Sequence, residues 1–117
     1  MGKLNVVCLA AVLGLVAHSA AAADNCGRRD GLKVSGWGND WVYEHIDSML
    51  TLTDAADQPT NNNGSFIDVH TGRNVRELRV CTHESGCVSF GPGQSSRIPL
   101  GGRFREVQVN VAWCLRS

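Results

Sequence analysis

Three side chains in the middle of this 117-residue chain, His70, Glu77 and Arg79, are candidates for acid–base chemistry. Proton transfer requires titrating groups within hydrogen-bond reach of one another, and an arginine can hold a phosphate beside them. All three lie in segments with the composition of strands, so one sheet face could bring them together. The corresponding hypothesis is a hydrolase of ribonuclease type, in which His70 and Glu77 transfer protons and Arg79 holds the phosphate.

The spacing of histidines and cysteines does not indicate a metal centre. His45, His70 and His83 lie 25 and 13 residues apart, and no two of them share a ligand spacing such as HxH. The four cysteines beyond the N-terminal segment form no CxxC pair, which argues against both zinc and a redox-active motif. We therefore expect neither a metal nor a cofactor.

Three aromatic residues, Trp37, Trp41 and Tyr43, lie close together beside two glycines. Exposed aromatic rings next to a loop can stack on the faces of sugars or anchor a protein partner. The alternative is that at least two of them fill the core, since a small domain with few aromatic residues needs its large side chains inside. This group is our candidate binding surface, together with the polar loop from Asp54 to Gly64.

That loop contains acidic and amide side chains that are suited to calcium, but it does not match an EF-hand. Pro59 occupies the position of the first Asp in that pattern, and His70 occupies the position of its final Glu. Asn63 begins an Asn-Gly-Ser glycosylation sequon, which matters only in a eukaryotic host. We interpret the segment as a loop rich in turns.

Arginines form a second candidate for recognition, because a guanidinium group binds carboxylate, phosphate or sulfate through two-point contacts. They occur as two groups, Arg73, Arg76 and Arg79, and Arg97, Arg103 and Arg105. The alternative, which we favour, is that these side chains lie on solvated strand faces and pair with Glu77 and Glu106.

Residues 1–23 have the pattern of a secretion signal. Lys3 supplies the positive start, Val6 to Val16 is an unbroken apolar run, and Ala20 to Ala23 offers a small-residue cleavage site. An uncleaved anchor would need about 20 apolar residues, and this run has 11. We expect cleavage there and a single mature domain of residues 24–117, secreted or periplasmic, without membrane contact.

The charge composition of this mature domain argues against two classes of partner, nucleic acids and membrane surfaces. Removal of Lys3 with the signal leaves ten basic residues against eleven acidic ones, and no block of like charge remains. A nucleic-acid-binding protein would show a basic face, and a membrane-surface protein would show a polybasic segment. We therefore expect an extracellular protein or a glycan as the partner, and no nucleic acid.

Four cysteines remain after removal of the signal, an even number as a disulfide framework requires. We favour the pairs Cys26–Cys114 and Cys81–Cys87. The second pair brackets five residues that include a glycine, which suits two facing positions across a hairpin. The two crossed pairings remain open at this point, because four cysteines allow three connectivities.

Alternating apolar residues predict a strand at 107–113, where Val107, Val109, Val111 and Trp113 share one face. Phe104 is out of step with this pattern, which predicts a bulge or a twist near Arg105. The other predicted strands are 32–35, 66–70, 77–82 and 87–90, separated by Gly- and Asn-rich turns.

The segment 41–52 fits two patterns. Val42, Ile46 and Leu50 have helical spacing behind a capping Asn39 or Asp40, but the same residues also alternate as in a strand. We favour a strand here because the remainder is β-like. The expected fold is mainly β, a small antiparallel sandwich or barrel stapled by two disulfides, with room for one short helix near 41–51.

Three functions follow as hypotheses. The first, which we favour, is a non-enzymatic module that binds a glycan or a protein through Trp37, Trp41 and Tyr43. The second is the ribonuclease-type hydrolase. The third is a secreted effector, toxin or enzyme inhibitor that presents the stapled segment Thr82 to Gly86, with Glu84 in contact with its target, because a cross-linked hairpin is preorganised.

Overall fold

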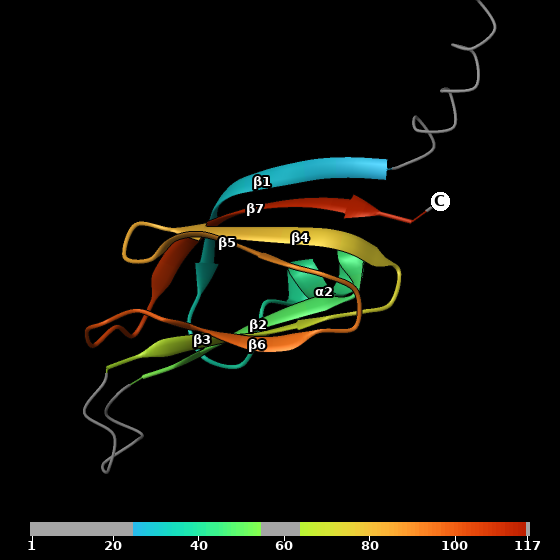
Figure 1. The fold of residues 1–117 in the computed structure, drawn as a ribbon. Helices are drawn as coiled ribbons and strands as arrows, with labels where there is room; N and C mark the ends of the chain where they lie inside the picture. The colour runs from blue at the N-terminus through green and yellow to red at the C-terminus, as the bar shows by residue number, and fades with distance from the viewer. Residues whose placement is uncertain (1–24, 55–63, 117) are drawn as a thin grey trace, which may run out of the picture.

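Two antiparallel sheets lie face to face in the computed structural model, which describes residues 25–54 and 64–116 (Figure 1). The four-stranded sheet has the order β1 (Asn25–Val34), β7 (Val107–Leu115), β4 (Val75–Thr82) and β5 (Gly86–Phe90). The three-stranded sheet has the order β2 (Ser48–Thr53), β3 (Phe66–Thr71) and β6 (Ser95–Pro99). The predicted β-rich sandwich is confirmed, and the sheets do not close into a barrel.

The core lies between the two sheets and is built from the inward positions of both. Leu78 from β4 and Leu50 from β2 are both fully buried, as are Ile67 from β3 and Ile98 from β6. The predicted alternation of β7 is confirmed, because Val107, Val109 and Val111 are buried and the residues between them are exposed. β7 begins only at Val107, so Arg105 lies in the bend before the strand and the predicted bulge is not part of its ladder.

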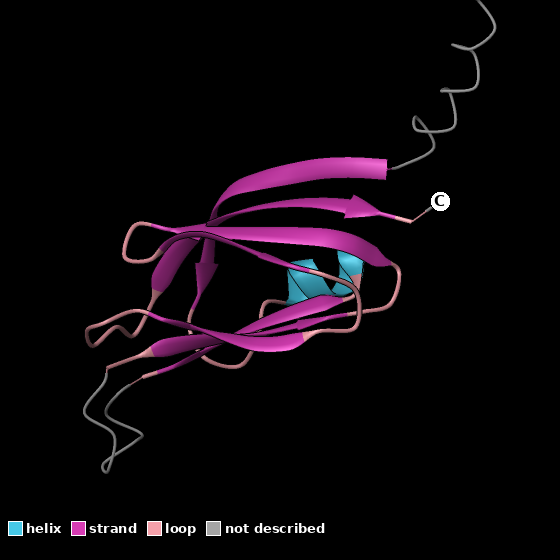
Figure 2. Cartoon of the chain, viewed as in Figure 1, coloured by secondary structure: helices cyan, strands magenta, loops and turns pink. Residues whose placement is uncertain are grey.

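The helix α2 (Asp40–Ile46) corrects our preference for a strand in the first half of the segment 41–52, where the expected fold also allowed one short helix (Figure 2). The second half of the segment is the strand β2. Asn39 caps it: the side-chain oxygen accepts a hydrogen bond from the backbone N–H of Val42 at 3.1 Å. Val42 and Ile46 lie one turn apart on the buried face, and Asp47 ends the helix in the left-handed conformation at φ 52°. The cap outweighs the coincidental alternation, and β2 begins directly afterwards.

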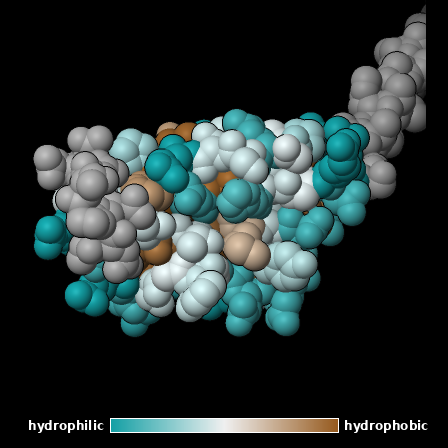
Figure 3. Space-filling view, turned by 90° about the horizontal axis from the view of Figure 1, so that it is seen from below, coloured by the Kyte–Doolittle hydropathy of each residue, from teal (hydrophilic) through white to brown (hydrophobic). Residues whose placement is uncertain are grey.

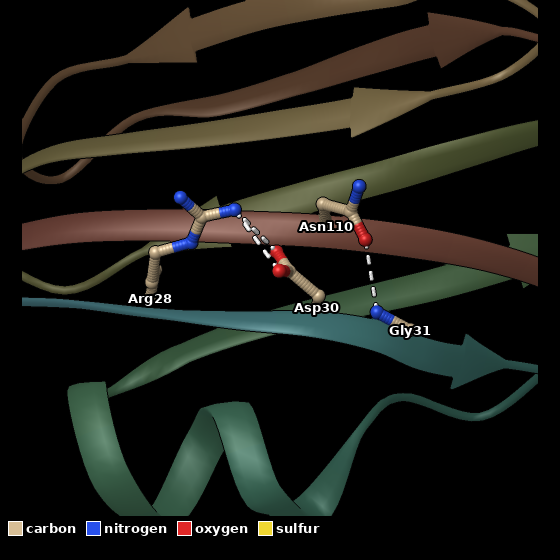
Figure 4. Close-up of polar contacts among 4 residues, drawn as sticks. All are labelled: Arg28, Asp30, Gly31 and Asn110. Atoms are coloured by element: carbon tan, nitrogen blue, oxygen red, sulfur yellow. Dashed lines mark hydrogen bonds and ion pairs between the residues drawn. The ribbon is translucent and has the colours of Figure 1, made fainter.

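A bulge interrupts the pairing of β1 with β7, where Asp30 and Gly31 together stand opposite Asn110 (Figure 4). Gly31 adopts a φ of +70°, which favours glycine, and its N–H donates to the side-chain oxygen of Asn110 at 2.9 Å. Beside the bulge, one terminal nitrogen of Arg28 contacts both carboxylate oxygens of Asp30 at 2.9 Å. The bulge therefore fixes two charged side chains on the outer surface.

Both disulfides have the favoured pairing. Cys26 stands directly opposite Cys114 in the β1–β7 ladder, and Cys81 stands opposite Cys87 in the β4–β5 hairpin. All four cysteines lie at outward-facing positions of the four-stranded sheet. The disulfides therefore link neighbouring strands on the solvent side of this sheet and lie outside the core. Paired cysteines indicate an oxidising environment for the folded chain.

Candidate functional site

The outer face of the three-stranded sheet carries a group of polar side chains that the strand register brings together. Asp68 stands between Thr51 and Arg97, and His70 has Ser95 as its partner on β6. We call these five residues the polar face. Figure 3 views this side of the molecule, where hydrophilic and near-neutral residues surround small apolar areas.

An ion pair at the centre of the polar face fixes the guanidinium group of Arg97. Its Nε donates to the Oδ1 atom of Asp68 at 2.9 Å, and the guanidinium carbon lies 3.6 Å from the ring centroid of Phe66. Within residues 25–54 and 64–116, neither terminal nitrogen of Arg97 takes part in a hydrogen bond or ion pair, so both can donate to a ligand. The pair therefore holds a fixed set of donors and acceptors at the surface.

A second polar pair adjoins the first. Nδ1 of His70 lies 2.9 Å from the hydroxyl of Ser95, and the tautomer of the ring decides which of the two donates. His70 and Ser95 are both exposed, so the remaining ring nitrogen and the hydroxyl face solvent. Like the ion pair, this contact presents hydrogen-bonding groups on a flat strand surface.

Trp37 lies in the turn between β1 and α2 and is 92% exposed. The hydroxyl of Thr51 donates to the backbone carbonyl of Trp37 at 2.8 Å, which ties the turn to the edge strand β2. Gly38, the next residue, packs so closely on Met49 that an added Cβ would come within 2.9 Å of its side chain. The turn that carries the exposed Trp37 is therefore anchored to the polar face through Thr51.

The other two predicted aromatic residues occupy different environments. Tyr43 is 55% exposed on α2, whereas Trp41 is half-buried and packs against the core. The ring of Trp41 stacks on His45 with a centroid separation of 4.5 Å and meets Trp113 at 5.2 Å. The structure therefore does not bring Trp37, Trp41 and Tyr43 into one set of equally exposed rings.

The three residues of the hydrolase hypothesis lie on opposite sides of the sandwich. His70 projects from the outer face of the three-stranded sheet, while Glu77 and Arg79 project from the outer face of the four-stranded sheet. The hydrophobic core separates them, because β3 and β4 contribute buried residues to it from either side. The structure does not place His70 within reach of Glu77 or Arg79.

The remaining predicted residues do not join the polar face. Glu84 is exposed at the tip of the β4–β5 hairpin, whose Ser85 hydroxyl donates to the backbone carbonyl of Pro99. Asn63 and most of the polar loop lie outside the described residues, as does the signal segment 1–23. In the described part of the chain, ion pairs join Arg28 to Asp30, Arg97 to Asp68 and Arg105 to Asp54, and none of these three involves the expected partners Glu77 and Glu106.

Within residues 25–54 and 64–116, no three His, Cys, Asp or Glu side chains come together in an arrangement suited to a metal ion. In the same part of the chain, no helix has the length and apolar character needed to cross a bilayer. Comparisons of the chain with protein-family models, curated proteins and solved structures found no match.

Proposed function

We propose that the mature domain is an exported glycan-binding module that holds its ligand with Trp37 and the polar face. The observation that carries this proposal is an indole that is 92% exposed, in a turn hydrogen-bonded to Thr51 of that face. A large apolar side chain left in water has an unfavourable hydration free energy, which a ligand that covers it can relieve.

The chemistry of a sugar matches both parts of this surface. A pyranose ring has a weakly apolar face of C–H groups that can stack on an indole, and its hydroxyls both donate and accept hydrogen bonds. Asp68 accepts, Arg97 donates, and Ser95 with His70 can do either. Because each group is held by a neighbour, little side-chain entropy is lost when a ligand binds.

A glycan fits this face better than a protein partner does. Protein interfaces are centred on well-packed apolar or aromatic anchors with few charges in their middle. Here the middle of the face is the ion pair of Asp68 with Arg97, and the turn that carries the exposed Trp37 is hydrogen-bonded to the edge strand β2. Contacts with a protein are the competing outcome in the experiment below.

Export is the second part of the proposal. Residues 1–23 act as a secretion signal, and the domain operates outside the cytosol in the oxidised form. The paired cysteines support this location, because disulfides persist mainly in extracellular and periplasmic compartments. Mass determination of the natural protein, which should show a new N-terminus near Asp24, tests this part separately.

Replacement of Arg97 by methionine tests the binding function. We expect the oxidised domain to bind at least one neutral oligosaccharide from a panel of cello-, xylo-, manno- and chito-oligomers, measured by calorimetry. The Arg97→Met variant should bind about 10-fold more weakly, because it loses charge-assisted hydrogen bonds and keeps an apolar stem over Phe66.

Arg103→Met is the matched control, since Arg103 is exposed and lies outside the polar face. Its affinity should equal that of the original chain, and both variants should unfold at similar denaturant concentrations. Absence of saccharide binding across the panel, with capture of a protein partner instead, would overturn the glycan proposal.

A further inference from the structure

A groove on the outer face of the four-stranded sheet lies on the side of the sandwich opposite to the polar face. It has a volume of about 440 Å³ and is bordered by Arg28, Glu77, Arg79, Ala112 and the Cys26–Cys114 disulfide. Small-ligand sites have volumes of about 300–1,000 Å³, so the groove has room for a single sugar or a small acid. Neither the sequence motifs nor the proposed glycan surface accounts for it.

The strand register places one arginine on each side of Ala112, a small residue of this groove. Arg28 on β1 and Arg79 on β4 both stand opposite Ala112 of β7, which lies between them. A second hollow of about 170 Å³ on the other side of this row is bordered by the same three residues. Both arginines therefore border the space above Ala112.

Each guanidinium group retains free donors. Asp30 occupies only one terminal nitrogen of Arg28, which holds the side chain in place and leaves its Nε and other terminal nitrogen without a partner in the described ranges (Figure 4). Arg79 has no ion pair or side-chain hydrogen bond within residues 25–54 and 64–116. A guanidinium with adjacent free N–H groups is a two-point receptor for an oxyanion.

Glu77 decides which oxyanion fits. Its carboxylate borders the same groove, two residues before Arg79 on the same strand, and has no side-chain partner in the described ranges. A phosphate dianion beside this carboxylate would be repelled more strongly than a monoanion. A hydroxyl or ammonium group on the ligand, in contrast, would find a hydrogen-bond acceptor in Glu77.

We propose that this groove binds a hydroxylated monocarboxylate of the uronic acid class. Arg28 and Arg79 hold its carboxylate, Glu77 accepts a hydrogen bond from a hydroxyl, and Ala112 lies beneath the ring. The disulfide Cys26–Cys114 fixes one end of the groove, so the receptor is rigid before the ligand arrives. This site is independent of Trp37, because it lies on the other sheet.

Titration with glucuronate, followed by amide chemical shifts, tests the assignment. The shifts of Arg28, Arg79 and Ala112 should respond to glucuronate, and glucose should leave them unchanged because it lacks the carboxylate. Arg79→Gln should weaken glucuronate binding about 10-fold, since one charge-assisted contact is lost. Ala112→Leu should abolish binding by filling the groove, with the fold checked by the unchanged shifts of β3 and β6.

Control variants separate this site from non-specific attraction and from the glycan surface. Arg73→Gln removes an exposed arginine outside the groove and should leave glucuronate binding unchanged. Trp37→Ala should also leave it unchanged, so a failed glycan proposal does not affect this test. Glu77→Gln should strengthen binding of glucose 6-phosphate relative to glucuronate.

Three results would overturn the proposal. Equal responses to glucose and glucuronate would show that the arginines do not select a carboxylate. Tighter binding of glucose 6-phosphate than of glucuronate by the original chain would show that Glu77 does not exclude dianions. Unchanged affinity in Arg79→Gln would exclude the guanidinium pair as the receptor.

Discussion

Removal of the Cys26–Cys114 disulfide is expected to lower the free energy of unfolding by about 4.5 kcal/mol. This bond joins residues 88 positions apart, so it restricts most of the domain in the unfolded state. The restriction by Cys81–Cys87, with a separation of 6, is worth only about 2.4 kcal/mol. A domain of this size has a free energy of unfolding of only a few kcal/mol. Loss of the Cys26–Cys114 bond should therefore leave much of the protein unfolded.

Urea unfolding of two double variants measures this difference. Cys26→Ala with Cys114→Ala removes the long-range bond without leaving a free thiol, and Cys81→Ala with Cys87→Ala is the matched control. The first variant should have a much lower unfolding midpoint than the second. Equal losses would mean that the entropy of the unfolded chain does not determine how these bonds stabilise the domain.

Replacement of Trp37 by alanine is expected to weaken glycan binding by about 30-fold, the effect of losing an aromatic anchor worth roughly 2 kcal/mol. The free energy of unfolding of the Trp37→Ala variant should differ from that of the original chain by less than about 0.5 kcal/mol, because a side chain that is 92% exposed makes few contacts in the folded state. Replacement of Trp37 therefore tests its part in binding without a change in the stability of the domain.

Tyr43→Ala is the control for this change, since Tyr43 is 55% exposed on α2 and lies outside the polar face. Calorimetry with the best oligosaccharide of the panel should give this variant less than a twofold loss. A larger loss in Tyr43→Ala than in Trp37→Ala would move the contact surface from the turn to the helix.

The fold was largely predictable because its signals are local. Alternating valines define β7, and the odd number of residues between Cys81 and Cys87 matches facing positions in a hairpin. The helix α2 was allowed for near 41–51 but a strand was favoured, because six residues that alternate in polarity also satisfy a helix once Asn39 caps it. β6 was missed because its Ser95–Pro99 sequence is poor in the residues that favour strands.

The candidate site was predictable only in part. Trp37 was recognised from its type and its flanking glycines, but the polar face depends on strand pairing that no local pattern encodes. Asp68 meets Arg97 only because β3 pairs with β6 across 29 positions of sequence. In the same way, His70 and Arg79 both alternate outward, yet they belong to different sheets.

The most direct test of the account is a nitrogen–proton correlation spectrum of the oxidised domain, recorded during titration with the oligosaccharide that binds best. We predict that the largest shift changes occur at the indole N–H of Trp37 and at the backbone amides of Thr51, Asp68 and Arg97. Changes confined to the hairpin at Glu84 or to the helix, with these four signals unmoved, would contradict glycan binding at the three-stranded sheet.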